Sequence, residues 1–276
     1  MVNKTGSKLL SSIQRMVVRL SKTYQYQLSN DLEVSVYQKL TAHKNLFSIF
    51  LLLVAASLVC VLLTAVRMER SDTARYAHMR WNLMLAWIPF LFAALAYALA
   101  NARRRILYPL VLASAGTWLL FFPNAPYILT DFQHLSRVTD GIPVWYDVIL
   151  LIWFAWTGLL LGVVSLYMMQ EIVTRSMGKT AGWLFVILVS GLTGFGVYVG
   201  RFMRWNSWDI WHQPLPLLQD IWNQLRHPLA NKDTFVFTII FSLLLLFIYL
   251  AMMLLGNLKA ERQKQQVAVT HQTKTV

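Results

Sequence analysis

The sequence predicts an all-α, polytopic membrane protein, a bundle of six transmembrane helices. Of its 276 residues, 57% are hydrophobic and only 13% are charged, whereas soluble domains carry about 25% charged residues. Several apolar runs approach the roughly 20 residues that a helix needs to cross a bilayer. Apolar and polar residues do not alternate with a period of two along these runs, so helices rather than strands are predicted to span.

Six apolar runs define the predicted spans. They cover residues 46–66, 81–100, 106–122, 144–170, 183–200 and 235–255. Pro89 predicts a kink in the second span, and Pro123 ends the third, because proline cannot donate the backbone hydrogen bond that continues a helix. The fourth run exceeds about 20 residues and is expected to tilt or protrude. Residues 46–255 therefore form the predicted transmembrane domain.

The segments on either side of this domain are polar. In residues 1–45, apolar residues at helical spacing among lysines and arginines indicate either a basic amphipathic helix on the inner membrane surface or a partly disordered cytoplasmic tail. Residues 256–276 form a predicted polar cytoplasmic tail. The one cysteine, Cys60, lies inside the first run, which excludes an intrachain disulfide and CxxC metal or redox motifs.

The distribution of basic residues predicts how the chain is oriented. With the N-terminus inside, the inner segments hold 16 of the 25 Lys and Arg residues and the outer segments hold 9. The short inner triplet Arg103–Arg105 adds a strong local contribution. Both termini are therefore predicted to be cytoplasmic. The connections after the third and fifth helices are then both on the outer face.

The net charge of +13 does not indicate nucleic-acid binding, because the basic residues lie at the ends of the apolar runs and not on one soluble module. Basic ends orient helices and attract anionic lipid. Membrane lipids are therefore the expected partners, and nucleic acid is not. A protein partner or a homo-oligomer is left open.

A first polar cluster, Phe121–Leu135, follows the third apolar run. Pro123 and Pro126 end the helix, and the apolar residues beyond them recur at helical spacing. Asp131 and His134 are three residues apart, so a short interfacial helix would present both on one side. The alternative interpretation is a loop whose prolines end a helix and whose Asp and His are solvated.

A second polar cluster, Gly200–Asp209, follows the fifth run. Arg201, Arg204, Trp205 and Trp208 fall on one helical face, where Arg201 can lie over Trp205. The planar guanidinium groups of the two arginines suit phosphate or carboxylate. Alternatively, these arginines and tryptophans are ordinary anchors at the membrane interface.

Asp147 lies just inside the fourth apolar run, where a carboxylate is costly unless it is paired. Arg201 or Arg204 is the expected partner, because the fifth helix ends at the same membrane level. The other runs contain no Asp, Glu, Lys, Arg or His. That pattern opposes an ion-coupled transporter, which places ionisable groups near the midplane.

Two D-x-x-H pairs, Asp131 with His134 and Asp209 with His212, could together supply four metal ligands. A spacing of three arises easily by chance, and there is no H-E-x-x-H motif. No metal and no cofactor are therefore expected. An apolar stripe between residues 217 and 225 predicts a helix on the outer surface, either a lid over the site or a filler between helices.

Several of these segments together resemble one family. They are Pro123–Tyr127, the following Thr130 and Asp131, Trp145–Asp147, and Gly200–Asp209 with its sequence GRFMRWNSWD. They resemble the bacterial membrane proteins called domain of unknown function 1361, and the resemblance covers roughly residues 46–255. It implies an integral protein of the bacterial cytoplasmic membrane. It supplies no agreed substrate and no catalytic residues.

The leading functional hypothesis is a polar pocket at the outer face that binds or modifies an anionic lipid or a lipid-linked head group. Its predicted catalytic residues are Asp131, as general base, and His134. Its predicted ligand-binding residues are Asn124, Tyr127, Asp147, Arg201, Arg204, Asn206 and Asp209. The alternatives are a non-enzymatic scaffold or accessory subunit, and a small-solute transporter. Whether the protein is an enzyme is left open.

Overall fold

The computed structural model describes residues 46–102, 104–135 and 141–274, with side chains described up to residue 257. The predicted amphipathic segment at residues 1–45 lies outside these residues. The chain divides into two compact units, Met1–Val54 and Ala55–Val276. The larger unit contains every contact discussed below.

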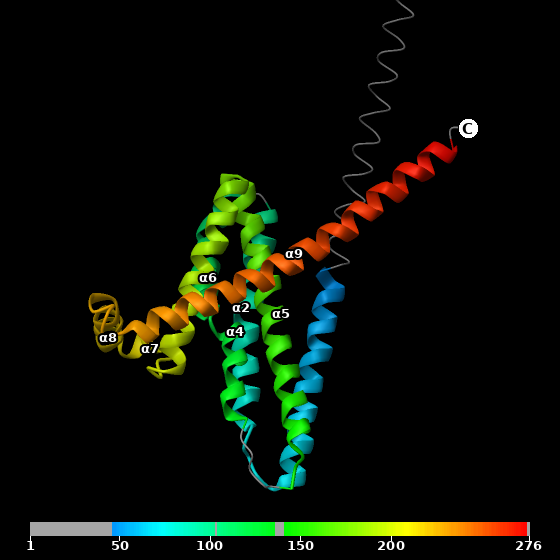
Figure 1. Cartoon of the computed structure of the whole chain (residues 1–276). Helices are drawn as coiled ribbons and strands as arrows, with labels where there is room; N and C mark the ends of the chain where they lie inside the picture. Colours follow the sequence, from blue (N-terminus) through cyan, green and yellow to red (C-terminus); the bar gives the residue numbers. More distant parts are fainter. Residues whose placement is uncertain (1–45, 103, 136–140, 275–276) are drawn as a thin grey trace, which may run out of the picture. The chain divides into compact units, whose positions relative to one another are not determined.

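Six helices are long and apolar enough to cross a membrane, which confirms the predicted all-α fold with six spans. They are Leu46–Ser71, Ala77–Asn101, Arg105–His134, Val144–Met177, Lys179–Arg201 and Lys232–Asn257. The second, fourth and fifth are helices α2, α5 and α6 in Figure 1, and the sixth is the first part of α9, Lys232–Lys274. The described residues contain no strand.

The third span consists of several helical segments. A short 3-10 turn, η1 (Arg105–Leu107), leads into α3 (Tyr108–Phe121), and α4 (Asn124–Tyr127) and the 3-10 helix η2 (Ile128–His134) follow. Pro123 interrupts the α-helix, as predicted, but the chain keeps a helical path to His134. The polar residues of the first cluster therefore stay close to the bundle.

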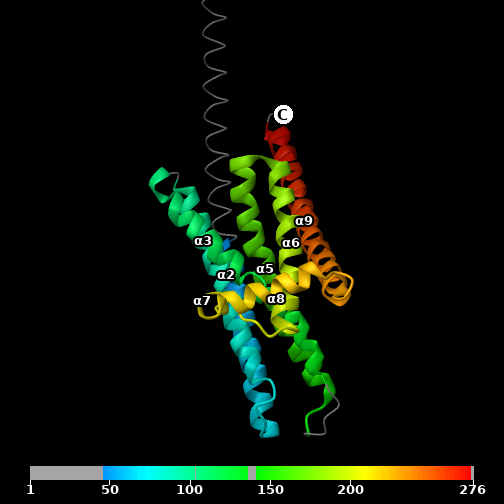
Figure 2. The ribbon, with the colours of Figure 1, turned by 90° about the vertical axis from the view of Figure 1, so that its left-hand side faces the viewer.

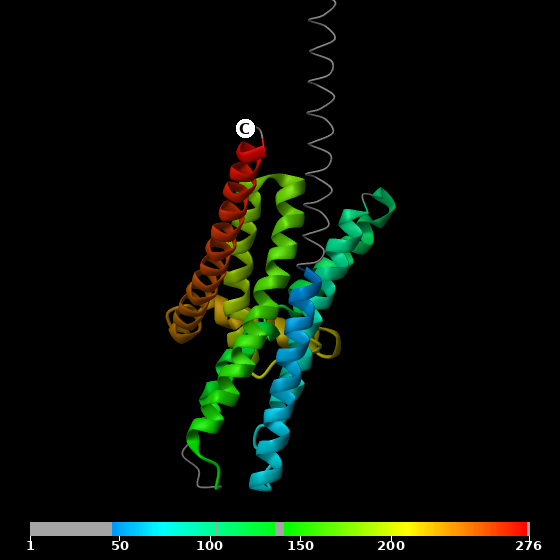
Figure 3. The ribbon, with the colours of Figure 1, turned by 90° about the vertical axis from the view of Figure 1, so that its right-hand side faces the viewer.

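Helix α2 packs against α3 and α5, and α6 packs against α5 and α9. The buried side of α2 carries Met79, Leu83, Ala86, Phe90 and Ala93 at steps of three and four residues, the spacing of one helical face. Figures 2 and 3 show that α3 leans away from the neighbouring α5 and α6 along part of its length. Leu184, Leu188 and Leu192 of α6 are exposed.

The connection after α6 forms two short helices, α7 (Asp209–His212) and α8 (Pro214–Arg226), and α8 runs across the direction of the long helices in Figure 2. Leu217 of α8 is buried, whereas Leu218 and Trp222 are exposed. The apolar stripe predicted between residues 217 and 225 is thus helical. It packs inward along one edge and leaves a second apolar edge uncovered.

Candidate functional site

A buried ion pair joins the two polar clusters. Arg201, the last residue of α6, donates a hydrogen bond from Nη2 to Oδ1 of Asp131, whose side chain is fully buried. Its Nε donates to Thr130 Oγ1 at 2.7 Å, and its Nη1 lies 3.3 Å from His134 Nε2. The guanidinium carbon lies 4.3 Å from the centre of the Tyr127 ring. All three guanidinium nitrogens thus have partners within the protein. Arg201 stacks on Tyr127, whereas the sequence had predicted that it would lie over Trp205.

The second oxygen of Asp131 is also engaged. Asn82 of α2 donates from Nδ2 to Asp131 Oδ2 at 3.0 Å. Both oxygens of the Asp131 carboxylate therefore accept hydrogen bonds from within the protein. Asp131 thus anchors α2, η2 and α6 to one another, and its role as a general base stays a prediction. Sequence reasoning missed Asn82; its only signal was a polar residue one position into an apolar run.

A second buried ion pair holds Asp147. Arg67 donates from Nε to Oδ1 at 2.8 Å and from Nη2 to Oδ2 at 3.2 Å, and its own side chain is fully buried. The prediction that Arg201 or Arg204 would pair with Asp147 was therefore wrong. The apolar run stops at Val66, but the helix continues to Ser71, so Arg67 is a helical residue facing α5 and not a loop residue.

Tyr76 connects the two ion pairs. Its hydroxyl donates to Asp147 Oδ2 at 3.2 Å and lies 3.4 Å from the backbone oxygen of His134. Burial, followed by the charge of Asp147, raises the pKa of Tyr76 from its ordinary 10.0 to about 12. The phenol therefore stays protonated and keeps donating at any physiological pH.

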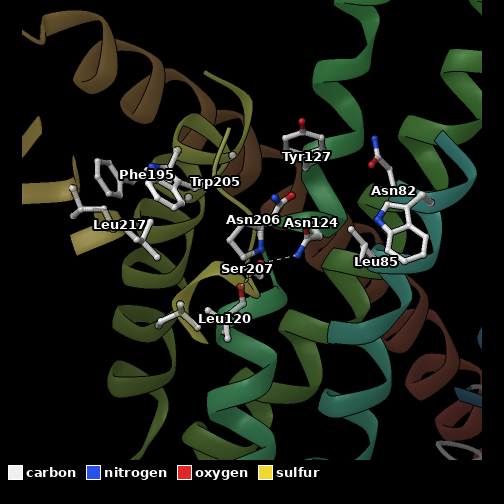
Figure 4. A pocket seen from close by; sticks show the side chains of 17 residues that line it. Asn82, Leu85, Leu120, Asn124, Tyr127, Phe195, Trp205, Asn206, Ser207 and Leu217 are labelled. Atoms are coloured by element: carbon white, nitrogen blue, oxygen red, sulfur yellow. Dashed lines mark hydrogen bonds between the residues drawn. The ribbon is translucent and has the colours of Figure 1, made fainter. Parts of the chain in front are cut away.

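A cavity of about 270 Å³ is drawn in Figure 4. Its lining includes Asn82, which donates to Asp131, and Tyr127, on which Arg201 stacks. Helices α2, α4, α6 and α8 and the loop after α6 contribute to its wall. The polar and aromatic residues that line it are Trp81, Asn82, Asn124, Tyr127, Phe195, Trp205, Asn206 and Ser207, and most of the remaining lining is aliphatic. No charged side chain belongs to this lining. The polar part of the wall therefore consists of amides and hydroxyls, and not of ions.

Hydrogen bonds fix the loop after α6 against α3 and α4. Asn124 donates from Nδ2 to Phe121 O at 3.0 Å and to Ser207 Oγ at 3.1 Å, the bond dashed in Figure 4. Ser207 in turn donates to Leu120 O at 3.0 Å. The second polar cluster is therefore attached directly to the first, as expected for two walls of one site.

The structure divides the nine predicted site residues into separate groups. Asn124, Tyr127 and Asn206 line the cavity. Asp131, His134 and Arg201 form the adjacent ionic cluster, and Asp147 belongs to the second ion pair. Arg204 is exposed with a φ of 63°, and Asp209 Oδ2 accepts from the backbone N of Asn206 at 2.7 Å. The two last residues shape the loop and do not line the cavity.

A second cavity of about 330 Å³ adjoins the first. Gly116, Leu119, Leu120, Pro123, Leu192 and Thr193, from α3, α6 and the residues that follow α3, line it. Leu120 and Pro123 line both cavities. A mainly apolar groove between two membrane-spanning helices thus shares part of its wall with an amide-lined cavity.

The metal-ligand arrangement considered from the sequence does not form within the described part of the chain. The ligand atoms of His78, Asp131 and His134 lie within 4.8 Å of one another. Arg201, however, already contacts both Asp131 and His134 there. Asp209 and His212, the other D-x-x-H pair, contact residues close to them in the sequence. Asp209 accepts a hydrogen bond from Asn206, and His212 Nδ1 lies 3.1 Å from Trp208 O. Arg201 therefore already contacts two of the three residues of this group.

The six helices that are long and apolar enough to cross a membrane indicate a multi-pass membrane protein. The family model described as "Protein of unknown function (DUF1361)" matches residues 81–248, and the chain belongs to that family. The resemblance inferred from the two polar clusters is therefore confirmed. All residues that line the two cavities fall within the matched range. No curated protein and no solved structure matches the chain.

Proposed function

We propose that the protein binds a membrane lipid or a lipid-linked molecule, with the polar end in the amide-lined cavity and an apolar chain in the adjoining groove. The observation that carries this proposal is the shared wall of the two cavities at Leu120 and Pro123. One ligand that is polar at one end and apolar at the other would fill both. A small polar solute would use only the first cavity.

The surroundings of the groove support entry from the membrane. Leu119 of α3 and Leu192 of α6 line it and are also exposed on the helix surface. In a bilayer, such exposed apolar side chains contact acyl chains. A lipid tail can therefore move from the bilayer into the groove without crossing a polar region.

The test fills the groove and measures bound lipid. Gly116 lines the groove, and a Cβ built there meets no atom within 4 Å, so Gly116→Leu occupies space without a backbone clash. Native mass spectrometry of the purified protein in mild detergent should show lipid adducts in the wild type and at least a fivefold loss in Gly116→Leu. The physical reason is that the leucine side chain of the variant would occupy the part of the groove that the lipid chain fills in the wild type.

Gly191→Leu is the matched control. Gly191 also lies in a spanning helix with no atom within 4 Å of its Cβ position, and it lines neither cavity. Its lipid adducts should equal those of the wild type. Equal adducts in both variants would refute the proposal. Co-purification of a stoichiometric protein partner without bound lipid would instead favour the scaffold alternative. Solute flux in proteoliposomes would favour the transporter alternative.

A further inference from the structure

Three amide side chains line the first cavity, and each has its nitrogen held by the protein. Asn82 Nδ2 donates to Asp131 Oδ2 at 3.0 Å, and Asn124 Nδ2 donates to Phe121 O at 3.0 Å. Asn206 Nδ2 donates to Asp209 Oδ2 at 3.2 Å. Figure 4 shows the three side chains around the same space, although they come from α2, α4 and the loop after α6.

The chemistry of these partners fixes how each amide is turned. A carboxylate oxygen and a backbone carbonyl oxygen can only accept hydrogen bonds, so the NH₂ group of each amide must face its partner. Turning any amide by 180° would place two acceptor oxygens against each other. Each carbonyl oxygen is therefore directed away from its protein partner.

These carbonyl oxygens remain available to a ligand. Within the described residues, Oδ1 of Asn82, Asn124 and Asn206 accepts no hydrogen bond from the protein. The Tyr127 ring is held by Arg201, and its hydroxyl makes no hydrogen bond to any described residue. The cavity thus offers three acceptors and one hydroxyl, and a complementary ligand must supply several hydrogen-bond donors.

The charges around the cavity further restrict the chemical class of ligand that it can bind. Three amide oxygens present the negative ends of their dipoles, so an anionic phosphate or carboxylate would meet these acceptors, with only the Tyr127 hydroxyl and the Trp81 indole N–H able to donate to it. A cation would meet no carboxylate in the lining and would lie near the guanidinium stacked on Tyr127. Neutral hydroxyl groups can donate hydrogen bonds to the amide oxygens, and they carry no charge that the cavity would leave unmatched. Trp81 and Trp205 add flat apolar surfaces to the wall.

We propose that the cavity binds a neutral, polyhydroxylated head group of the sugar type, whose hydroxyls donate to the amide oxygens of Asn82, Asn124 and Asn206. The proposal rests on the lipid-binding function proposed above and names the head-group class that this site selects. It replaces the anionic head group that the two arginines had suggested. Arg201 is engaged by Asp131, and Arg204 lies outside the lining.

The test is a competition among three lipids with identical acyl chains: monoglucosyldiacylglycerol, phosphatidylglycerol and phosphatidylethanolamine. Each is added to delipidated protein in mild detergent, and bound lipid is quantified by native mass spectrometry. The glucosyl lipid should bind at least tenfold more tightly than phosphatidylglycerol. It should also exceed phosphatidylethanolamine, whose ammonium supplies donors together with a charge.

Asn206→Ala isolates the proposed contact. The backbone N of Asn206 still donates to Asp209 Oδ2 at 2.7 Å, so the turn keeps its main hydrogen bond. Affinity for the glucosyl lipid should fall by about fivefold, the effect of one neutral hydrogen bond, and the affinity for phosphatidylglycerol should change by less. Asn223→Ala, an exposed asparagine of α8 outside the cavity, is the matched control and should alter neither.

The outcomes separate the two proposals. Preference for phosphatidylglycerol, or equal binding of all three lipids with no effect of Asn206→Ala, would overturn the sugar inference and leave lipid binding intact. Lipid adducts in Gly116→Leu equal to those of the wild type would overturn the lipid site proposed above, and the sugar inference with it. Tighter binding of the glucosyl lipid, reduced only by the cavity variant, would support both.

Discussion

At the scale of single residues, two buried arginine–carboxylate pairs organise one end of the bundle. Each pair, Arg67 with Asp147 and Arg201 with Asp131, holds two opposite charges away from solvent. Deleting one partner of such a pair strongly destabilises the protein, because the other charge is left buried and unpaired. Charge placement alone therefore cannot identify a ligand site here. The arginine that looked most suited to an anionic ligand is engaged by the protein itself.

The Tyr76 hydroxyl gives a test of the link between these pairs. Tyr76→Phe removes the hydrogen bond to Asp147 and should lower the free energy of unfolding by about 1 kcal/mol. Because the pKa of Tyr76 is raised from 10.0 to about 12 in the folded protein, the folded state keeps its proton where the unfolded state loses it. The advantage of the wild type should be complete below pH 10 and decline as the pH rises toward 12.

Denaturation of both proteins in the same detergent, at pH 7 to 8 and again near pH 11, measures this difference. Equal stability of wild type and Tyr76→Phe at neutral pH would show that the hydroxyl does not connect the pairs. A difference that grows with pH would contradict the stated direction of the pKa shift.

At the scale of elements, the position of α4 depends on one close approach to α5. A Cβ at Gly158 would lie 2.5 Å from the backbone oxygen of Ala125 and 3.0 Å from Ile128 Cδ1. Only glycine lets the segment after Pro123 lie this near to α5. The same approach holds Asn124 and Tyr127 at the cavity, so helix packing and site geometry depend on the same contact.

Gly158→Ala should destabilise the protein by about 1–3 kcal/mol, because a backbone atom must move to make room. Gly191→Ala is the control, since nothing lies within 4 Å of its Cβ position, and alanine there should stabilise α6 by about 0.5–1 kcal/mol. Thermal unfolding in detergent compares the two. A Gly158→Ala protein as stable as Gly191→Ala would mean that α4 does not need this approach.

Helix α8 is the element that closes the cavity on one side. Leu217 and Ile221 line the cavity, and two hydrogen bonds hold the helix, from Trp205 Nε1 to Asp220 Oδ2 at 2.9 Å and from Thr234 Oγ1 to Gln224 Oε1 at 2.8 Å. Of the two roles predicted for this stripe, a cover over the site fits these contacts better than a filler between helices.

At the scale of the whole molecule, orientation in the membrane stays a prediction that labelling can test. Cys60 is the only cysteine and is buried, so wild type should resist a membrane-impermeant maleimide and serves as the control. Leu229 and Met177 are exposed, at 93% and 73%, and belong to opposite ends of the spanning helices. Leu229→Cys should label in intact cells, and Met177→Cys only after the membrane is permeabilised. The reverse pattern would place the cavity on the cytoplasmic side.

The sequence by itself determined the six spans, the ends of several helices and the family. These features depend on residues that are neighbours in the sequence. The hydropathy of about 20 consecutive positions decides whether a helix can span, and a proline such as Pro123 interrupts an α-helix in any protein. It also predicted that the two polar clusters belong together, because both follow apolar runs at the same predicted face. Asn124, Tyr127 and Asn206 were identified in this way.

Only the tertiary structure decided what each polar residue contacts. Asn82 meets Asp131 across 49 positions of sequence, and Arg67 meets Asp147 across 80. Pairings at such separations depend on how far each helix extends and on which face it buries, and neither the continuation of the first helix to Ser71 nor the approach at Gly158 has a local signal. The resulting contacts bind Arg201 to Asp131 and leave the amide oxygens of Asn82, Asn124 and Asn206 without a hydrogen bond from the described residues.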